Sequence, residues 1–139
     1  MFREYGFEFE VNDYDADLLA PETHYDGERG WFAVAEDASG RVLGCIGVTD
    51  EGGGVFELHR LYVSAGARRS GAGSLLTQWV IDTAREHGAR KVILFSDVHF
   101  ADAHRLYLRF GFTNTRFRYA PDPWQSREWG FERSLEATD

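Results

Sequence analysis

The sequence predicts an α+β fold, in which a mixed and mainly antiparallel sheet of about six to seven strands is flanked by helices. Short runs of alternating or continuous apolar residues recur along the chain and are separated by polar or glycine-rich turns, as strands are. Segments 74–87 and 101–110 instead repeat apolar residues every three or four positions, the spacing of a helix face. Between them lies an almost unbroken apolar run at 91–95, which predicts a central strand buried on both faces.

The first half of the chain predicts strands joined by tight turns. Residues 12–30 are polar and contain proline and glycine, so they predict at most a short irregular helix. Turns rich in Asp and Gly at 37–40 and 50–54 predict a hairpin followed by a further antiparallel strand. The strands expected in this half are 6–11, 31–35, 41–48 and 56–63.

The second half predicts two helices and three strands. Gly88 and Gly111 follow the two helical patterns at the position where glycine commonly ends a helix. The elements expected in this half are helix 74–87, strand 91–95, helix 101–110, and strands 112–119 and 128–135. We see no repeat or linker, so residues 1–139 are interpreted as a single domain with a shortened helical region at about 12–30.

Composition limits the classes of partner. A net charge of −8 argues against nucleic acid and weakly favours a cationic substrate such as an amine. The single cysteine, Cys45, allows no intrachain disulfide and reads as a small core residue. Because neither a signal peptide nor a transmembrane segment is visible, we expect a cytoplasmic protein with no membrane partner.

The loop between strand 56–63 and the following helix predicts an anion site, most simply for a phosphate. It reads Arg68-Arg69-Ser70-Gly71-Ala72-Gly73, followed by Ser74. Backbone N–H groups at a helix N-terminus are unpaired, glycines let an anion approach them, and arginines add charge. Ser74-Leu75 after the last glycine does not fit a nucleoside triphosphate loop, and Leu76 makes a dinucleotide fingerprint weak.

Two motifs carry a family resemblance. The Arg-x-x-Gly-x-Gly pattern of Arg68–Gly73 resembles the coenzyme A pyrophosphate loop of the GCN5-related N-acetyltransferases, the GNAT family. The segment Ala103–Phe112 is similar to that family's second signature, Ala-x-x-Leu-Tyr-x-x-x-Gly-Phe. The resemblance covers 31–135 and implies a sheet whose two central strands splay apart. It also implies acetyl transfer from acetyl-CoA to a primary amine by direct attack in a ternary complex, without a metal.

The resemblance also implies roles for individual residues. An alkylammonium acceptor has a pKa of about 10 and must lose a proton, and Glu57 matches the family's general base. His59 is an alternative base or a substrate contact. Tyr107 matches the general acid that protonates the leaving thiolate, with core packing as its alternative role. The residues implied in cofactor binding are Leu61, Tyr62, Val63, Arg68, Arg69, Ser70, Gly71, Ala72, Gly73, Ser74 and Ala103.

Strand alternation predicts which side chains share a face. In strand 56–63, one face is expected to carry Leu58, Arg60 and Tyr62, and the other Glu57, His59, Leu61 and Val63. Groups near Leu61–Val63 would then offer backbone contacts to the pantetheine arm and an N–H to the oxyanion.

Some departures from the family pattern leave alternatives open. The asparagine common before the second signature is replaced near Phe100. The short region at 12–30 leaves the acceptor side open or completed by a second subunit, as in a homodimer. The acceptor could therefore be a small amine, a protein N-terminus or a lysine. Two alternatives come from other classes of function: a non-catalytic module that binds acyl-CoA, and a phosphate-loop protein that binds nucleotides.

Two further groups of residues have ordinary interpretations. Asp97, His99, Asp102 and His104 crowd together in the sequence, but they are expected on a turn and on different faces of a helix start, so no metal site is predicted. Trp124, Trp129 and Phe131 could line an acceptor pocket or a dimer interface. For Phe131 we favour core packing.

Overall fold

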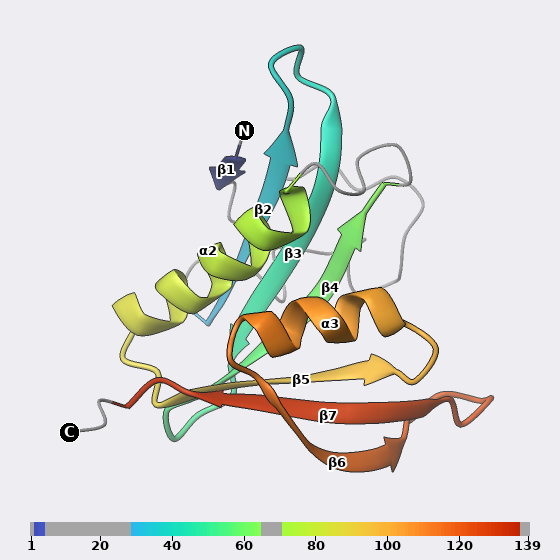
Figure 1. The fold of residues 1–139 in the computed structure, drawn as a ribbon. Coiled ribbons are helices and arrows are strands. Elements are labelled where there is room, and N and C mark those ends of the chain that lie inside the picture. The colour runs from blue at the N-terminus through green and yellow to red at the C-terminus, as the bar shows by residue number, and fades with distance from the viewer. Residues whose placement is uncertain (1, 5–28, 65–70, 137–139) are drawn as a thin grey trace.

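The protein is described by a computed structural model that places residues 2–4, 29–64 and 71–136. These residues form a seven-stranded sheet with the order β1-β2-β3-β4-β5-β7-β6 (Figure 1). The β4–β5 pair is parallel and the other neighbours are antiparallel, so the prediction of a mixed and mainly antiparallel sheet is confirmed. The elements are β1 Phe2–Glu4, β2 Gly30–Glu36, β3 Val42–Asp50, β4 Val55–Val63, α2 Ala72–Glu86, β5 Lys91–Asp97, α3 Ala101–Arg109, β6 Thr113–Tyr119 and β7 Arg127–Ser134.

Both helices lie on one face of the sheet. Figure 1 shows α2 lying across β2, β3 and β4, and α3 lying over β5 and β7. The apolar face of α2, with Leu76 and Val80 fully buried, packs against Phe56 and Leu58 of β4 in one continuous core. This packing holds the N-terminus of α2 against the end of β4. There, a Cβ on Gly73 would lie 3.7 Å from Val63.

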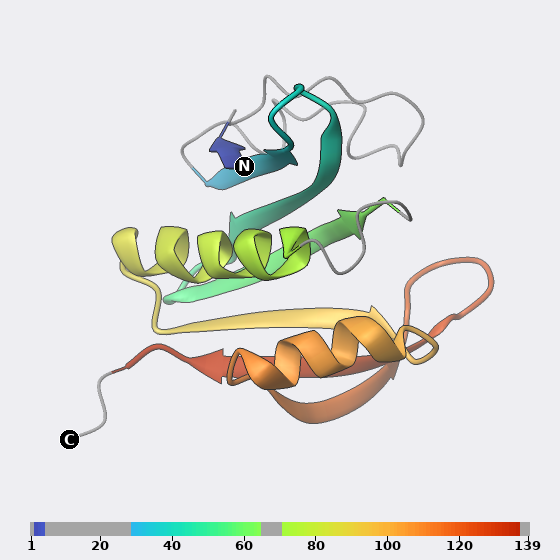
Figure 2. The ribbon, with the colours of Figure 1, turned by 45° about the horizontal axis from the view of Figure 1, so that its top comes forward.

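The two central strands separate after a short paired stretch. Val55–Glu57 of β4 pairs with Lys91–Ile93 of β5, and beyond these residues the strands are not partners (Figure 2). The predicted splay is therefore confirmed. Because unpaired strand groups face each other across it, the gap offers backbone donors and acceptors to an extended ligand.

A β-bulge interrupts β4 within the splayed part. His59 pairs with Gly47 and Tyr62 with Cys45, so two residues of β4 oppose Ile46 alone. The extra residue reverses the side-chain alternation, and Leu61 and Val63 pack against the core beneath α2. The sequence-based prediction that these two residues share a face with Glu57 is wrong for this reason.

Most predicted elements are present, with differences at their edges. The first helix begins at Ala72, two residues earlier than expected, and Gly88 follows its end with φ +82°. Strand β5 alternates between buried and half-buried residues, so burial on both faces is incorrect. Its half-buried face includes Phe95 and Asp97, which line a cavity.

Two expectations concern the N-terminal part. Strand β1 at Phe2–Glu4 pairs with β2 and was not predicted. The predicted strand 6–11 and nearly all of the region 12–30 lie outside the described residues. Within the described part of the chain, no helix is both long and apolar enough to cross a membrane.

Candidate active site

A cavity of about 470 Å³ opens at the splay between β4 and β5. It collects side chains from both central strands, from α3 and from the C-terminal hairpin. The lining residues are Cys45, Glu57, Leu58, His59, Leu61, Tyr62, Phe95, Ser96, Asp97, Phe100, Ala103, Tyr107, Arg118 and Glu128. Glu57 and Tyr107, the two predicted catalytic residues, therefore line the same cavity, together with Leu61, Tyr62 and Ala103.

Glu57 projects from the paired end of β4 and its side chain is 20% exposed. Burial raises the pKa of its carboxyl to about 7, and the neighbouring negative charges of Glu51 and Glu128 add to this effect. The positive charge of Arg118 opposes it. A carboxyl with a pKa near neutrality can both accept and release a proton at physiological pH, which is what a general base requires.

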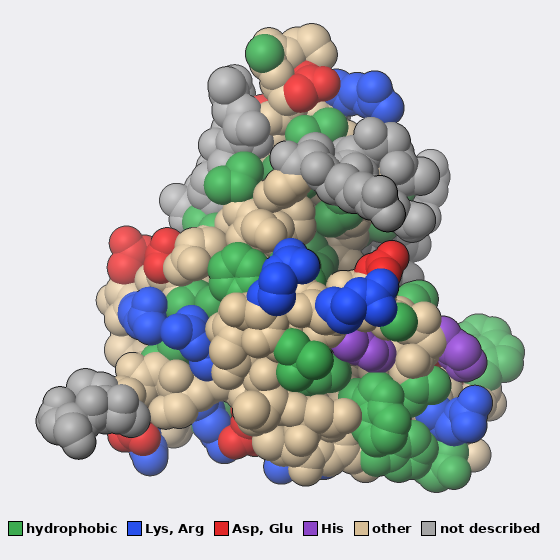
Figure 3. Space-filling view, in the orientation of Figure 1, with side chains coloured by type: hydrophobic (Ala, Val, Ile, Leu, Met, Phe, Trp, Pro, Cys, Tyr) green, Lys and Arg blue, Asp and Glu red, His purple; other side chains and the backbone are tan. Residues whose placement is uncertain are grey.

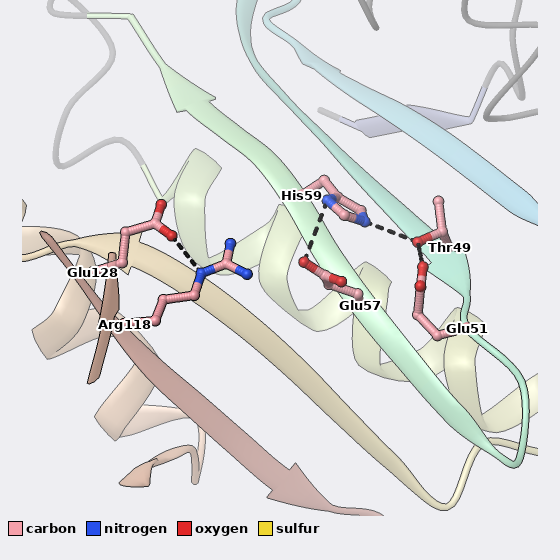
Figure 4. Close-up of polar contacts among 6 residues, drawn as sticks. All are labelled: Thr49, Glu51, Glu57, His59, Arg118 and Glu128. Atoms are coloured by element: carbon pink, nitrogen blue, oxygen red, sulfur yellow. Dashed lines mark hydrogen bonds and ion pairs between the residues drawn. The ribbon is translucent and has the colours of Figure 1, made fainter. Parts of the chain in front are cut away.

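A chain of polar contacts leads away from Glu57 (Figure 4). Its Oε2 lies 3.7 Å from Nδ1 of His59, and Nε2 of His59 lies 2.8 Å from Oγ1 of Thr49. The Thr49 hydroxyl in turn donates to Oε2 of Glu51 at 2.5 Å. His59 is thus held between a cavity-lining carboxyl and a hydroxyl on β3.

Arg118 and Glu128 approach Glu57 from the opposite wall. They face each other across the β6–β7 ladder, and Nε of Arg118 donates to Oε1 of Glu128 at 2.8 Å. The Arg118 guanidinium also stacks on the Phe95 ring, 3.5 Å from its centroid. These contacts fix Arg118 at the cavity wall with its charge near Glu57 (Figure 4).

Tyr107 reaches the cavity from α3 and is only 4% exposed. Its ring packs against Phe112 and Phe131, with centroid distances of 5.9 and 5.7 Å. Burial raises the pKa of its phenol above the usual range, so the hydroxyl stays protonated at neutral pH. No described residue hydrogen-bonds to this hydroxyl, which leaves it available as a donor toward the cavity.

The start of α2 has the features of an anion site. Gly71 adopts a left-handed conformation with φ +90° and precedes the first helical residue, Ala72. No described side chain caps this end, and the described first turn carries no acidic residue. The N–H groups of Gly73 and Ser74 belong to the first turn, where an α-helix offers them no carbonyl four residues earlier within the helix. Arg68, Arg69 and Ser70 lie outside the described residues.

Comparison with known proteins identifies the family. The model of the Acetyltransferase (GNAT) family matches residues 1–112. The chain belongs to the GNAT family. It is 33% identical over 118 residues to an uncharacterized N-acetyltransferase of Schizosaccharomyces pombe, covering 84% of this chain and 72% of that protein. It is 31% identical over 111 residues to the aminoalkylphosphonate N-acetyltransferase of Salmonella typhimurium, covering 76% and 67% respectively.

The fold agrees with this assignment. The crystal structure of Ard1 from Thermoplasma volcanium superimposes with a TM-score of 0.81 at 20% identity, covering 99% of this chain and 98% of that one. The family model and the relatives named N-acetyltransferases show that this GNAT protein is an acetyltransferase, and the superposition shows the shared fold. Gly71 and Gly73 of the first motif lie at the N-terminus of α2, and Ala103, Leu106 and Tyr107 of the second lie on α3.

Phe100 is the residue near the place where the family resemblance led us to expect an asparagine. Phe100 precedes α3, lines the cavity and is 60% exposed. Figure 3 shows hydrophobic side chains gathered at this end of the molecule. Trp124 is 81% exposed and Trp129 is 36% exposed, and neither is among the described residues that line the cavity. Phe131 is buried against Tyr107, which confirms its predicted core packing.

The residues that looked like a metal cluster in the sequence have separate partners. Asp97 contacts His99 at 2.7 Å, Asp102 pairs with Arg105, and Nε2 of His104 lies 3.0 Å from the Ser96 hydroxyl. The described group whose ligand-type atoms come within 4.8 Å of one another is a different one, formed by Glu51, Glu57 and His59.

Sequence reasoning missed four residues around Glu57. Thr49 lies near the end of β3 and Glu51 in the β3–β4 turn, whereas Arg118 and Glu128 come from β6 and β7. The hairpin pattern predicted the strands that carry them. Their proximity to Glu57 depends on non-local strand order, for which the sequence offers no local signal.

Proposed function

We propose that this GNAT protein transfers the acetyl group of acetyl-CoA to a primary amine of a small cationic acceptor, by direct attack in a ternary complex. The observation that carries the proposal is the placement of Glu57 and Tyr107 on one cavity, at the splay of the central strands. The described part of the cofactor region fits a coenzyme A group, because the N-terminus of α2, which no described side chain caps, suits its pyrophosphate, and the splay suits an extended arm.

In this proposal each residue has one task. Acetyl-CoA would supply a thioester as the acetyl donor. Glu57 removes a proton from the acceptor ammonium, directly or through a water, so that the amine nitrogen can attack the carbonyl carbon. A backbone N–H at the β4 bulge, between Leu61 and Val63, donates to the oxygen on which negative charge develops. Tyr107 donates its hydroxyl proton to the sulfur as the carbon–sulfur bond breaks, and its oxygen regains a proton from the attacking nitrogen as the amide forms.

Binding of the cofactor is assigned to the predicted residues. The N–H groups of Gly71, Ala72, Gly73 and Ser74 would hold the pyrophosphate, together with Arg68, Arg69 and Ser70. Main-chain groups of Leu61, Tyr62 and Val63 would pair with the pantetheine arm, and the small Ala103 would let that arm pass α3.

The charge of the cavity supports a cationic acceptor. Glu57, Asp97 and Glu128 line it, against the single described cation Arg118, which is already paired with Glu128. A protein N-terminus or a lysine remains the alternative acceptor. A named relative acts on aminoalkylphosphonates, so these amines belong in the same acceptor panel.

The test is acceptor-dependent release of free thiol from acetyl-CoA, with peptides, diamines and aminoalkylphosphonates as acceptors. We expect Glu57→Gln and Tyr107→Phe each to lower kcat by about 10²–10⁴-fold. Calorimetry should show nearly unchanged acetyl-CoA affinity for both variants. Acetyl-CoA binding without thiol release for any amine would indicate a non-catalytic binding module, and wild-type rates in the variants would remove these residues from the mechanism.

A further inference from the structure

The polar contacts beyond Glu57 form a continuous path from the cavity to the protein surface. We propose that His59, Thr49 and Glu51 relay the acceptor's proton from Glu57 to solvent. This inference rests on the proposed role of Glu57 as general base and adds three residues to the reaction. The path runs from β4 across to β3 and ends at the β3–β4 turn, where Glu51 is exposed (Figure 4).

The reaction itself creates the need for such a path. An ammonium acceptor and a thioester give an amide, a thiol and one proton, so one proton must leave the site in every turnover. Glu57 is largely buried already, and a bound acceptor and cofactor would cover its remaining exposed surface. While both ligands are bound, Glu57 can lose its proton only to a neighbouring group of the protein.

The direction of the hydrogen bonds suits outward transfer. The Thr49 hydroxyl has one proton and donates it to the Glu51 carboxylate, which can only accept. The Thr49 oxygen must therefore accept from His59, which assigns the His59 proton to Nε2. In the neutral ring Nδ1 of His59 is then the unprotonated nitrogen, and it lies 3.7 Å from Oε2 of Glu57.

The transfer can be written with every proton accounted for. Protonated Glu57 donates to Nδ1 of His59 after a side-chain movement of about 1 Å, which brings the two atoms to hydrogen-bond distance. The Nε2 proton passes to the Thr49 oxygen as the Thr49 proton passes to Glu51, and Glu51 releases a proton to water. After the products leave, water can enter the cavity, and exchange of the His59 ring protons with this water restores the starting tautomer.

Groups on the other wall do not offer an equivalent exit. Arg118 faces Glu57 from β6 but is a permanent cation, and its Nε is bonded to Glu128. Its charge favours ionised Glu57 and so promotes departure of the proton. Thr49 is therefore the residue whose hydroxyl connects the base to the surface acceptor without itself lining the cavity.

The test uses steady-state thiol release by Thr49→Val, which keeps the side-chain shape and removes the hydroxyl. We expect kcat to fall about tenfold, with little change in the KM for acetyl-CoA. Added imidazole buffer, a small proton acceptor, should restore much of the lost rate at constant pH and ionic strength. Thr115→Val on β6 is the matched control and should have the wild-type kcat and no response to imidazole.

A second variant keeps the test valid if Thr49→Val fails to fold. Glu51→Gln at the exposed turn can still accept the Thr49 hydrogen bond but cannot take up the proton, so it should show the same buffer-dependent loss. Wild-type kcat in both variants, or a loss that buffer does not relieve, would overturn the relay. Loss of activity with EDTA and recovery with a divalent cation would also overturn it, because Glu51, Glu57 and His59 would then act as metal ligands.

The relay and the proposed function can fail separately. If Glu57→Gln has lost activity while Thr49→Val and Glu51→Gln retain it, the base assignment survives and the relay is wrong. If no amine gives thiol release in the wild-type protein, the proposed function itself fails.

Discussion

The burial of Glu57 suits a general base but lowers the stability of the folded protein when the carboxyl is ionised. Its carboxyl is placed in a largely buried setting beside the negative charges of Glu51 and Glu128, and its pKa rises to about 7. The same setting that suits a base makes ionisation costly in the folded protein. Arg118 limits this cost by contributing an opposite charge.

The cost has a definite dependence on pH. A carboxyl with a pKa of 4.5 in the unfolded chain and about 7 in the folded one binds more protons when folded. Stability is therefore full below pH 4.5 for this group and declines as pH rises to about 7, by at most about 3 kcal/mol.

Glu57→Gln should remove this loss because an amide does not ionise. We expect the variant to be more stable than the wild type at pH 8, by about 1–3 kcal/mol, and similar to it near pH 4.5. Urea unfolding at the two pH values measures the difference. An equal effect at both values would mean that packing, and not ionisation, separates the two proteins. Glu86→Gln, at an exposed position on α2, serves as a control. We expect its free energy of unfolding to equal that of the wild type at both pH values.

At the scale of elements, regular patterns were predictable and interruptions were not. The apolar spacing located α2, α3 and the strands around them, because each element buries one face. The bulge in β4 has no local signature, since the extra residue follows from pairing with β3. It turned Leu61 and Val63 to the opposite face from the one predicted, and it placed an irregular backbone at the splay where the cofactor is proposed to lie.

The turn into α2 depends on one backbone conformation. Gly71 has φ +90°, and a Cβ added there would meet no atom of the described residues within 4 Å, so we expect the cost of Gly71→Ala to be conformational. We expect a loss of stability of about 1 kcal/mol and, because the N–H groups at the helix start would shift, about tenfold weaker acetyl-CoA binding in calorimetry.

Gly40 provides a matched control in the β2–β3 turn. It has φ +87°, and a Cβ added there would likewise meet no atom within 4 Å. Gly40→Ala should lose about 1 kcal/mol as well, again for reasons of backbone conformation, and should bind acetyl-CoA as the wild type does. Equal affinity losses in both variants would show that general destabilisation, and not the α2 start, controls cofactor binding.

At the scale of the whole molecule, the site is assembled from distant parts of the chain. Family motifs led to Glu57, Tyr107, Leu61, Tyr62 and Ala103, and these residues do line one cavity. The motifs could not lead to Arg118 and Glu128, because these residues reach Glu57 only through the order in which β7 and β6 follow β5. The loop residues Arg68 and Arg69 stay predictions.

The overall negative charge and the acidic cavity act in the same direction on an acceptor. The chain carries a net charge of −8, and Asp97 lines the cavity with a pKa lowered by its hydrogen bonds to His99, so it is ionised at neutral pH. A diamine should therefore have a lower KM than a monoamine of the same length, by about tenfold at low salt. Raising the ionic strength from about 0.01 M to 0.3 M should remove most of this difference, because screening shortens the reach of the field.

Asp97→Asn tests whether the cavity or the overall surface charge lowers the KM for a diamine relative to a monoamine. It removes one charge from the cavity while the amide oxygen can still accept the His99 hydrogen bonds. We expect the KM for the diamine to rise several-fold while the KM for the monoamine and both kcat values change little. Asp82→Asn on α2 changes the net charge equally and should leave both KM values as they are. If the two variants raise the diamine KM alike, selection arises from long-range attraction, and the cavity itself does not recognise the second cationic group.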